Sequence, residues 1–270
     1  YIADCKKIGI KVLPPDVNES MEDFSVKGNT IRFGLSAIKN IGYNSITSII
    51  EERKNGPFID IDDFCCRVDL KATGKKVIES LVYSGAFLTM GYPRKGLLLA
   101  IDSAYEKGIN YQRDLNSNQV SLFDLDDFSM SESTSTVVGN EEFPIDEILL
   151  KEKEILGFYI SGHPLEQFEE LGNVDGFVDI VDIDEDFDGR RIVVRGVIEN
   201  YKERKTKNND IMATFNVEDE IGSLEVVAFP RVFTEAYNLM MKGKVVLVAG
   251  RMHLTERDTK ILAEKIVEPK

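Results

Sequence analysis

The side chains best suited to chemistry gather in one short stretch, residues 201–207, which reads Tyr-Lys-Glu-Arg-Lys-Thr-Lys. Four basic groups can attract the phosphates of a nucleic acid, and an aromatic ring can stack on any base. A solvated charged hairpin is the alternative. We expect single-strand binding from this stretch and from two positions on neighbouring strands: Tyr201, Lys202, Arg204, Lys205, Lys207, Thr214 and Arg251.

A second candidate site, residues 38–46, reads Ile-Lys-Asn-Ile-Gly-Tyr-Asn-Ser-Ile and resembles the helix-hairpin-helix motif. In that motif, backbone N–H groups at a helix N-terminus hold a DNA phosphate whatever the base sequence. Gly42 would allow close approach of the backbone. Asn40 stands where the motif usually has a first glycine, and it tolerates left-handed dihedrals. An ordinary helical turn is the alternative. The resemblance implies duplex-DNA contacts from Lys39, Asn40, Ile41, Gly42, Tyr43 and Asn44.

A looser second copy of this motif extends from residue 75 to residue 107. Its hairpin would be residues 84–87, Ser-Gly-Ala-Phe, followed by two basic residues. Tandem hairpins commonly pair into one unit, so this copy could be purely structural or could contact DNA directly. The residues expected to make such a contact are Gly85, Arg94 and Lys95.

From about residue 108 the sequence becomes rich in Asn, Ser, Asp and Thr, a composition typical of a linker. One apolar island within it, residues 119–123, fits the pattern Gln-x-x-Leu-Phe. It is similar to the short peptide that bacterial replication proteins insert into a sliding clamp, where the two apolar side chains fill a pocket. A chance match is the alternative. The residues expected to bind the clamp are Gln119, Ser121, Leu122 and Phe123.

The formal net charge of −14 is distributed unevenly along the chain. Residues 114–150 contain nine acidic side chains and no Lys or Arg, and residues 151–189 contain twelve acidic side chains and two basic ones. The two ends of the chain are mildly basic. Long-range attraction of DNA would be weak, so any contact must come from local basic clusters and backbone amides.

We expect no catalytic residue, metal site or cofactor in this chain. The acidic runs within 60–63 and 182–188 have no paired base and stand at turns, whereas two-metal nucleotidyl transfer needs carboxylates on a rigid sheet. The only histidines are His163 and His253.

No apolar run could span a bilayer and no signal peptide opens the chain, so we expect no membrane contact and a cytoplasmic location. The missing initiator methionine suggests a fragment of a longer protein.

Hydrophobic spacing predicts a multidomain α+β chain, with short helices in the first half and period-two strands in the last third. Strand, strand, strand, helix, strand, strand is the order of an OB-fold, a small barrel that often binds oligonucleotides. Helices are expected at 35–53 with a break at Gly42, 61–68, 75–83, 93–107, 145–159 and 231–241. Strands are expected at 191–202, 211–217, 223–229, 244–251 and 260–267.

Three longer segments, 31–42, 81–87 and 152–165, resemble the alpha subunits of bacterial DNA polymerase III, as does the order of the motifs. The resemblance spans essentially the whole chain. It implies the end of a fingers region at 1–30, a tandem helix-hairpin-helix domain at 31–110, an acidic linker with the clamp-binding peptide and a connecting helix at 111–189, and a five-stranded OB-fold barrel at 190–270.

The resemblance also implies that the full-length protein is a DNA-directed DNA polymerase, a nucleotidyltransferase that supports chromosomal replication. Its Mg²⁺-binding palm would lie upstream of this chain. The implied partners are duplex and single-stranded DNA, a sliding clamp and the remainder of the polymerase holoenzyme. Two other interpretations stay open: a free-standing, non-catalytic nucleic-acid-binding adaptor, and an RNA-binding OB-fold module.

Overall fold

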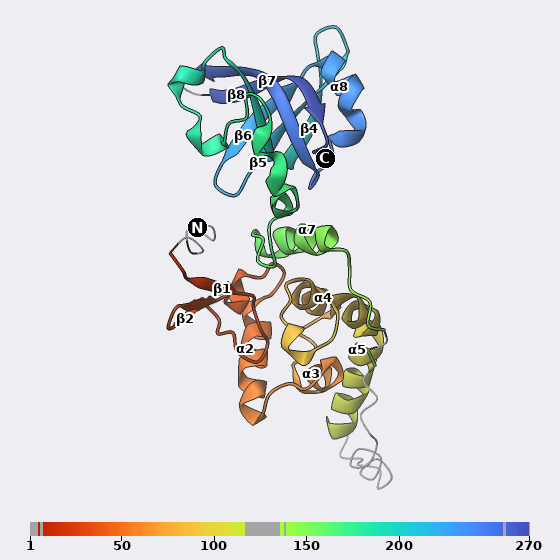
Figure 1. Cartoon of the computed structure of the whole chain (residues 1–270). Coiled ribbons are helices and arrows are strands. Elements are labelled where there is room, and N and C mark those ends of the chain that lie inside the picture. The colour runs from red at the N-terminus through yellow and green to blue at the C-terminus, as the bar shows by residue number, and fades with distance from the viewer. Residues whose placement is uncertain (1–4, 6–7, 117–135, 138, 256–257, 270) are drawn as a thin grey trace. The chain divides into compact units, whose positions relative to one another are not determined.

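The computed structural model describes residues 5, 8–116, 136–137, 139–255 and 258–269. The chain forms two compact units, Tyr1–Ser161 and Gly162–Lys270, each with its own apolar core (Figure 1). The first unit is mainly helical and the second is a closed β-barrel, so the expected α+β class is confirmed. None of the described helices is long and apolar enough to cross a membrane.

A small sheet opens the first unit. β1 (Lys11–Leu13) pairs in parallel with β3 (Thr30–Arg32), which pairs antiparallel with β2 (Ser25–Lys27). The segment between β1 and β2 turns inward, and its Val17 is fully buried in the core formed by the helices. The described residues before position 31, expected as a separate fingers segment, therefore share a core with the helices that follow.

The helices of the first unit surround large apolar side chains. Phe64 stacks edge to face on both Phe58 and Phe87, with ring centroids 5.0 Å apart in each pair. The helices are α2 (Tyr43–Glu52), α3 (Ile61–Arg67), α4 (Lys75–Tyr83), α5 (Arg94–Asn116) and α7 (Ile145–Leu156), and the 3-10 turns are η1 (Leu35–Ala37), η2 (Arg53–Asn55) and η3 (Leu88–Met90). In α2, Ile46 and Ile49 lie three residues apart and both face the core, as the helical period requires.

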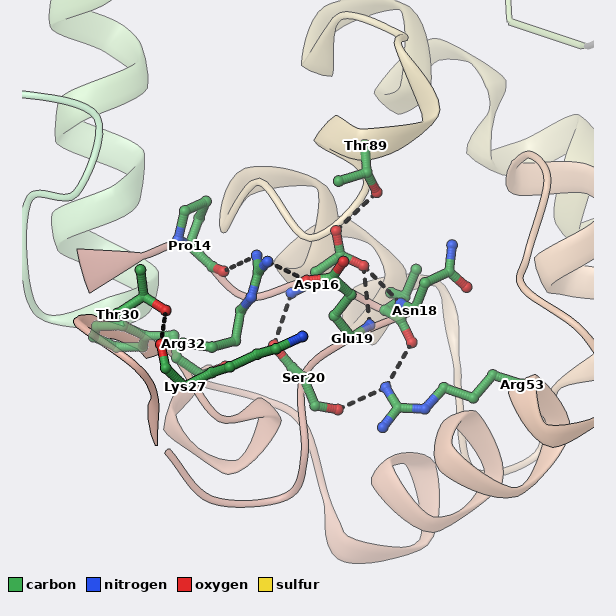
Figure 2. Close-up of polar contacts among 12 residues, drawn as sticks. Pro14, Asp16, Asn18, Glu19, Ser20, Lys27, Thr30, Arg32, Arg53 and Thr89 are labelled. Carbon is green, nitrogen blue, oxygen red and sulfur yellow. Dashed lines mark hydrogen bonds and ion pairs between the residues drawn. The ribbon is translucent and has the colours of Figure 1, made fainter. Parts of the chain in front are cut away.

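A buried polar network fixes the C-terminal end of α2 (Figure 2). Arg53 donates from Nη1 to the carbonyl oxygens of Val17 (3.1 Å) and Ser20 (2.6 Å). Asp16, which is 2% exposed, accepts a hydrogen bond from Thr89 Oγ1 (2.8 Å) and from backbone N–H groups of its own turn. Burial lowers the pKa of Arg53, and the nearby charge of Asp16 opposes this shift. The network therefore orients α2 against the N-terminal segment.

The helix expected at 35–53 is shorter in the structure. The α-helix covers Tyr43–Glu52, and residues 35–37 form a single 3-10 turn. The backbone between them leaves helical geometry, because Ile38 is extended (φ −85°, ψ 123°) and Asn40 is left-handed (φ 68°). The turn predicted around Asn40 is therefore present, but one 3-10 turn precedes it instead of a helix.

The helix α5 extends to Asn116, beyond the end expected at residue 107. Gly108 packs against α3, since a Cβ at this position would stand 2.4 Å from the carbonyl oxygen of Cys65. Gln112 then donates from Nε2 to carbonyl oxygens at the end of α3, at 3.2 Å for Cys65, 3.1 Å for Cys66 and 2.8 Å for Val68. These bonds satisfy carbonyl groups that a helix end leaves free. They hold the last turns of α5 against α3. The length of α5 therefore depends on tertiary contacts, which the local composition after residue 107 does not reveal.

The second unit is a barrel preceded by 3-10 turns. Its elements are η4 (Pro164–Asn173), η5 (Ile180–Asp182), η6 (Glu185–Phe187), β4 (Arg191–Lys205), β5 (Ile211–Glu218), β6 (Ser223–Ala228), α8 (Pro230–Ala236), η7 (Tyr237–Leu239), β7 (Val245–Thr255) and β8 (Asp258–Val267). The barrel closes in the order β4-β5-β6-β8-β7, and only β6 and β8 pair in parallel. Val232 and Phe233 of α8 join the barrel core. The predicted order of strands and helix, that of an OB-fold, is confirmed.

Two expected elements of the barrel differ in extent. β4 continues to Lys205, so much of the basic stretch 201–207 lies on a strand instead of in the loop expected there. The register of β4 shifts between Glu199 and Lys202 at a bulge, where Asn200 is left-handed (φ 53°). The helix expected at 231–241 divides into the short α8 and the 3-10 turn η7.

Replacing Gly108 by alanine tests the close approach of α5 to α3. Such a change stabilises an exposed helix interior by about 1 kcal/mol, but here the added methyl group would meet the backbone of Cys65. We expect Gly108→Ala to destabilise the first unit by about 1–3 kcal/mol in chemical denaturation followed by circular dichroism. The control Gly74→Ala adds its methyl group in open space and should cost at most about 1 kcal/mol. Unchanged or raised stability of Gly108→Ala would contradict the described packing.

Candidate nucleic-acid interface

The N-terminus of α2 carries a cluster of unbonded backbone donors, two in the exposed residues Tyr43 and Asn44 and one in Ser45, which is buried. Gly42 caps the helix without a side-chain hydrogen bond, and the N–H groups of Tyr43, Asn44 and Ser45 have no hydrogen-bond partner among the described residues. A Cβ at Gly42 would have no atom within 4 Å. Ile41 is half-buried, whereas Gly42, Tyr43 and Asn44 are exposed. Free N–H groups and the positive end of the helix dipole suit this terminus to an anion.

Lys39 and Asn40 hold the turn that precedes α2. Lys39 donates its backbone N–H to the carbonyl oxygen of Ile155 (3.0 Å) and its Nζ to that of Glu154 (2.7 Å), both in the last turn of α7. Asn40 donates from Nδ2 to Ser80 Oγ (3.1 Å) of α4. Both side chains, expected as DNA contacts, are thus engaged within the unit and position the exposed residues that follow.

A shallow depression of about 260 Å³ lies at the start of α2. Ser45 Oγ donates to the carbonyl oxygen of Ala72 (2.8 Å) and so joins α2 to a segment 27 residues later in the sequence. Lys71 and Lys76 are exposed and stand next to lining residues in the sequence, which adds positive charge nearby. Sequence reasoning misses these lysines, because only the tertiary contact relates them to α2. The lining residues are Asn40, Gly42, Tyr43, Asn44, Ser45, Ala72 and Val77.

The second hairpin copy is built into the interior of the unit. Arg94 is 5% exposed, and its Nη2 donates to Glu152 Oε1 at 2.8 Å. Gly85 is buried with a φ of +80°, and a Cβ there would stand 3.0 Å from Arg94 Nη2. Lys95 is half-buried and pairs with Glu141 at 2.8 Å. The geometry therefore does not place Gly85 or the guanidinium of Arg94 where DNA could reach them.

A continuous row of cross-strand neighbours encircles the outside of the barrel, and we name it the outer row. In order, it consists of Lys202, Thr214, Val227, Leu262, Arg251 and Arg191. Residues that alternate with it along the strands, such as Phe215 and Ile261, are buried in the barrel core, so the row faces outward. Basic groups on either side of an apolar centre can hold the phosphates and the bases of a single strand.

The outer row contains three predicted single-strand-binding residues: Lys202 and Thr214 are direct cross-strand neighbours, and Arg251 lies further along the row, beyond Val227 and Leu262. Arg204 stands two residues further along β4, opposite Met212, and belongs to the same face. Thr214 points outward but is only 9% exposed. Its hydroxyl therefore offers little surface to a ligand, and the basic side chains provide most of the exposed polar contact.

Tyr201, Lys205 and Lys207 lie outside the outer row. Tyr201 packs against the barrel core, and its hydroxyl donates to Glu203 Oε1 at 2.8 Å. Burial and this bond raise the pKa of the Tyr201 hydroxyl. The ring therefore serves packing more than the base stacking expected of it. Lys205 ends β4 and Lys207 lies in the following turn, and both are exposed.

Arg191 is a member of the outer row that sequence reasoning misses. Its side chain is 68% exposed and pairs with Glu264 at 2.8 Å. Period-two alternation alone gives many outward basic residues, and only the strand register places Arg191 beside Arg251. Arg191 could have been identified only from the correct pairing register of β4 with β7, and these strands lie far apart in the sequence.

The expected clamp-binding residues Gln119, Ser121, Leu122 and Phe123 lie outside the described residues. Among the residues that the structure does describe, no group of three or more His, Cys, Asp or Glu side chains could hold a metal ion. Cys65 and Cys66 are free thiols, and burial raises the pKa of Cys65 to about 12 and that of Cys66 to about 11. Both thiols are therefore protonated at neutral pH.

Family models match both units. A helix-hairpin-helix motif matches residues 9–97, and an OB-fold nucleic acid binding domain matches residues 189–269. The chain thus combines two folds of the nucleic-acid-binding class, which confirms the expected pairing of a helix-hairpin-helix domain with an OB-fold barrel.

The chain is also similar along its length to curated proteins. It is 34% identical to the DNA polymerase III subunit alpha of Bacillus subtilis over 95% of this chain and 22% of that protein. It is 36% identical to that of Aquifex aeolicus over 99% of this chain and 22% of that protein. The chain belongs to the family of bacterial DNA polymerase III alpha subunits, and it spans about a fifth of the length of the curated relatives that it matches.

Gly42→Ala tests whether a phosphate approaches the start of α2. The added methyl group meets no atom of the protein, so the variant should fold. It would stand where a phosphate comes close to the backbone. We expect duplex-DNA affinity in fluorescence anisotropy to fall about tenfold, which corresponds to about 1.4 kcal/mol.

Gly74→Ala is the matched control for Gly42→Ala. Gly74 also caps a helix, α4, without a side-chain hydrogen bond, and a Cβ there also meets open space. Alanine carries the same disadvantage at both helix caps. Equal loss of affinity in the two variants would argue against a specific contact at α2.

Lys202→Ala combined with Arg251→Ala tests the outer row. Loss of two phosphate contacts should lower the slope of log affinity against log salt by about 1.4, at about 0.7 per phosphate for a single strand. The measurement is anisotropy of a labelled single-stranded oligonucleotide over a range of salt. The control double variant, Arg231→Ala with Lys242→Ala, removes two exposed charges outside the row. The same change of slope in both double variants would exclude the row as the binding surface.

Proposed function

We propose that this chain holds DNA behind the active site of a replicative DNA polymerase and tethers that polymerase to a sliding clamp. One observation carries the proposal. Two nucleic-acid-binding folds stand in one chain that is similar along its whole length to DNA polymerase III alpha subunits. The contribution of the chain would be processivity, and the polymerising chemistry would belong to other parts of the full-length protein.

Duplex DNA would bind at the start of α2. The donors available there are backbone N–H groups, which contact phosphates and do not read bases. Such contact suits a polymerase, which must hold every sequence that it copies. The turn is held by Lys39 and Asn40 and the far end of α2 by Arg53, so the donors are fixed before DNA arrives.

Single-stranded template would bind along the outer row of the barrel. Lys202, Arg251 and Arg191 supply charge for phosphates, and Leu262 supplies apolar contact for bases. The row has no aromatic side chain, and the whole chain has a net charge of −14. We therefore expect weak, salt-sensitive binding that follows the strand without strong sequence preference.

The clamp-binding peptide would turn weak DNA binding into lasting attachment. A tether at residues 119–123 makes each rebinding to DNA an intramolecular event with a high effective concentration. In this proposal the polymerising site and its Mg²⁺ lie elsewhere in the full-length polymerase. The chain would act with the remainder of the holoenzyme in the cytoplasm.

Leu122→Ala combined with Phe123→Ala tests the clamp tether. The two apolar side chains should supply most of the contact in the clamp pocket, so their loss should weaken clamp binding at least about 100-fold, or about 2.7 kcal/mol. Isothermal titration calorimetry of the chain with a bacterial sliding clamp measures this. Phe128→Ala, in the same polar stretch of sequence, is the matched control and should bind as the wild type does.

Other results of these titrations would point to other functions. Unchanged clamp affinity of the double variant would remove the tether from the proposal. A chain that bound the clamp but neither form of DNA would be an adaptor that binds proteins and uses the barrel as a scaffold. A chain that preferred RNA to DNA of the same sequence would be an RNA-binding module.

A further inference from the structure

The N-terminus of α5 already holds a carboxylate from the chain itself. Glu142 Oε2 accepts a hydrogen bond from the backbone N–H of Arg94 (2.9 Å), and Glu142 Oε1 accepts one from the N–H of Lys95 (3.3 Å). Beside it, Lys95 Nζ donates to Glu141 Oε2 at 2.8 Å. Two consecutive acidic residues thus occupy two of the backbone donors and the ammonium group at the start of this helix.

A buried guanidinium lies directly behind this carboxylate. Arg94 Nη1 is 3.9 Å from Glu142 Oε2, and the Arg94 side chain is 6% exposed. Its Nη2 is paired with Glu152, whose Oε2 also accepts from the N–H groups of Ile160 (3.1 Å) and Ser161 (3.0 Å). Arg94 Nε has no hydrogen-bond partner among the described residues. Arg94 therefore lies behind Glu142 at ion-pair distance, while its hydrogen-bonded partner is Glu152.

The two acidic side chains are accessible to different degrees, and the Arg94 side chain behind them is buried. The side chain of Glu142 is 33% exposed and that of Glu141 is 83% exposed. The hydrogen bond between Lys95 and Glu141 raises the pKa of Lys95 and lowers the pKa of Glu141, so both are charged at neutral pH. Exposed pairs of this kind are weak and are screened by salt. A stronger anion could displace them without unfolding the buried part.

We infer that Glu141 and Glu142 are an internal mimic of a DNA phosphate, which masks a second phosphate-binding site at the start of α5. This inference rests on the proposed function, because the natural competitor is the backbone of duplex DNA. The displaced state would offer the N–H groups of Arg94 and Lys95 and the ammonium group of Lys95 to one phosphodiester. The Arg94 side chain stays with Glu152 and positions the site.

The mimic makes duplex binding depend on a competition inside the chain. While Glu142 is bonded to the start of α5, duplex DNA can reach the start of α2 but not the start of α5. Displacement of the acidic pair adds a second contact to the same backbone. The unit would therefore bind duplex DNA loosely at first and more tightly after displacement.

Glu142→Gln tests the mimic, because it removes the charge and keeps the size of the side chain. We expect the full chain to bind a short blunt-ended duplex several-fold more tightly. The slope of log affinity against log salt should steepen by about 0.9, the value for one further phosphate contact on B-DNA. Adding Lys95→Ala to Glu142→Gln should reverse both gains. Fluorescence anisotropy over a range of salt gives both quantities.

Glu147→Gln is the matched control, because Glu147 is an exposed acidic residue of α7 that also acts electrostatically on Lys95 but does not bond the start of α5. An equal gain in duplex-DNA affinity in both variants would show that removing any nearby negative charge has this effect, and would overturn the mimic. No gain with Glu142→Gln would also overturn it. If the wild-type chain binds no duplex at all, the proposed function itself fails, which separates the two outcomes.

A measurement on the wild-type chain covers the case in which Glu142→Gln does not fold. Hydrogen exchange followed by mass spectrometry reports on the segment 139–144 and on the first turn of α5. On addition of saturating duplex, exchange should rise in 139–144 as the acidic pair leaves, and should fall at the start of α5. Unchanged exchange in both segments under saturation would overturn the mimic.

Discussion

The arrangement depends on one physical constraint: a helix begins with backbone N–H groups that cannot bond within the helix. In this protein the start of α2 leaves three of them open, and a left-handed Asn40 turns the chain sharply just before them. The rest of the unit keeps that terminus in place. Asn40 is bonded to α4, Lys39 to α7, and Arg53 ties the other end of α2 to the N-terminal segment. These bonds hold the start of α2, with the exposed residues Tyr43 and Asn44, against the rest of the unit.

The same constraint is met in the opposite way at α5. There two of the free N–H groups, those of Arg94 and Lys95, are satisfied by the carboxylate of Glu142, and the basic side chain behind them is buried with Glu152. The barrel differs, because its strands present no helix N-terminus with free N–H groups. The binding surface proposed for the barrel therefore consists of side chains on the outer row. A chain with a net charge of −14 can therefore face DNA at small local surfaces.

The sequence predicted the architecture well where periodicity was strong. The order of the barrel strands, the helix α4 and the turn at Asn40 follow from local residue types, as does the division between a helical half and a β half. Prediction from the sequence failed where contacts between distant segments determine the extent of an element or the position of a side chain. Gly108 was interpreted as the start of a linker, but it allows α5 to pack on α3. Tyr201 was expected to stack on a base, but its ring packs against the barrel core. Arg94 was expected to contact DNA, but it is buried and paired with Glu152, which is 58 residues away in the sequence. The role of Arg191 could not be predicted, because it becomes a neighbour of Arg251 through the register of β4 on β7 and not through the period-two alternation along its own strand.

The most direct test of the account is a titration of the ¹⁵N-labelled chain with duplex DNA, followed by the backbone amide resonances of Tyr43, Asn44 and Ser45. If these N–H groups bind a phosphate, their resonances should shift progressively with DNA, and the shifts should saturate at the same concentration as binding measured by anisotropy. Resonances that stay unchanged while the chain binds duplex DNA would show that the start of α2 is not the contact, and would contradict the central claim.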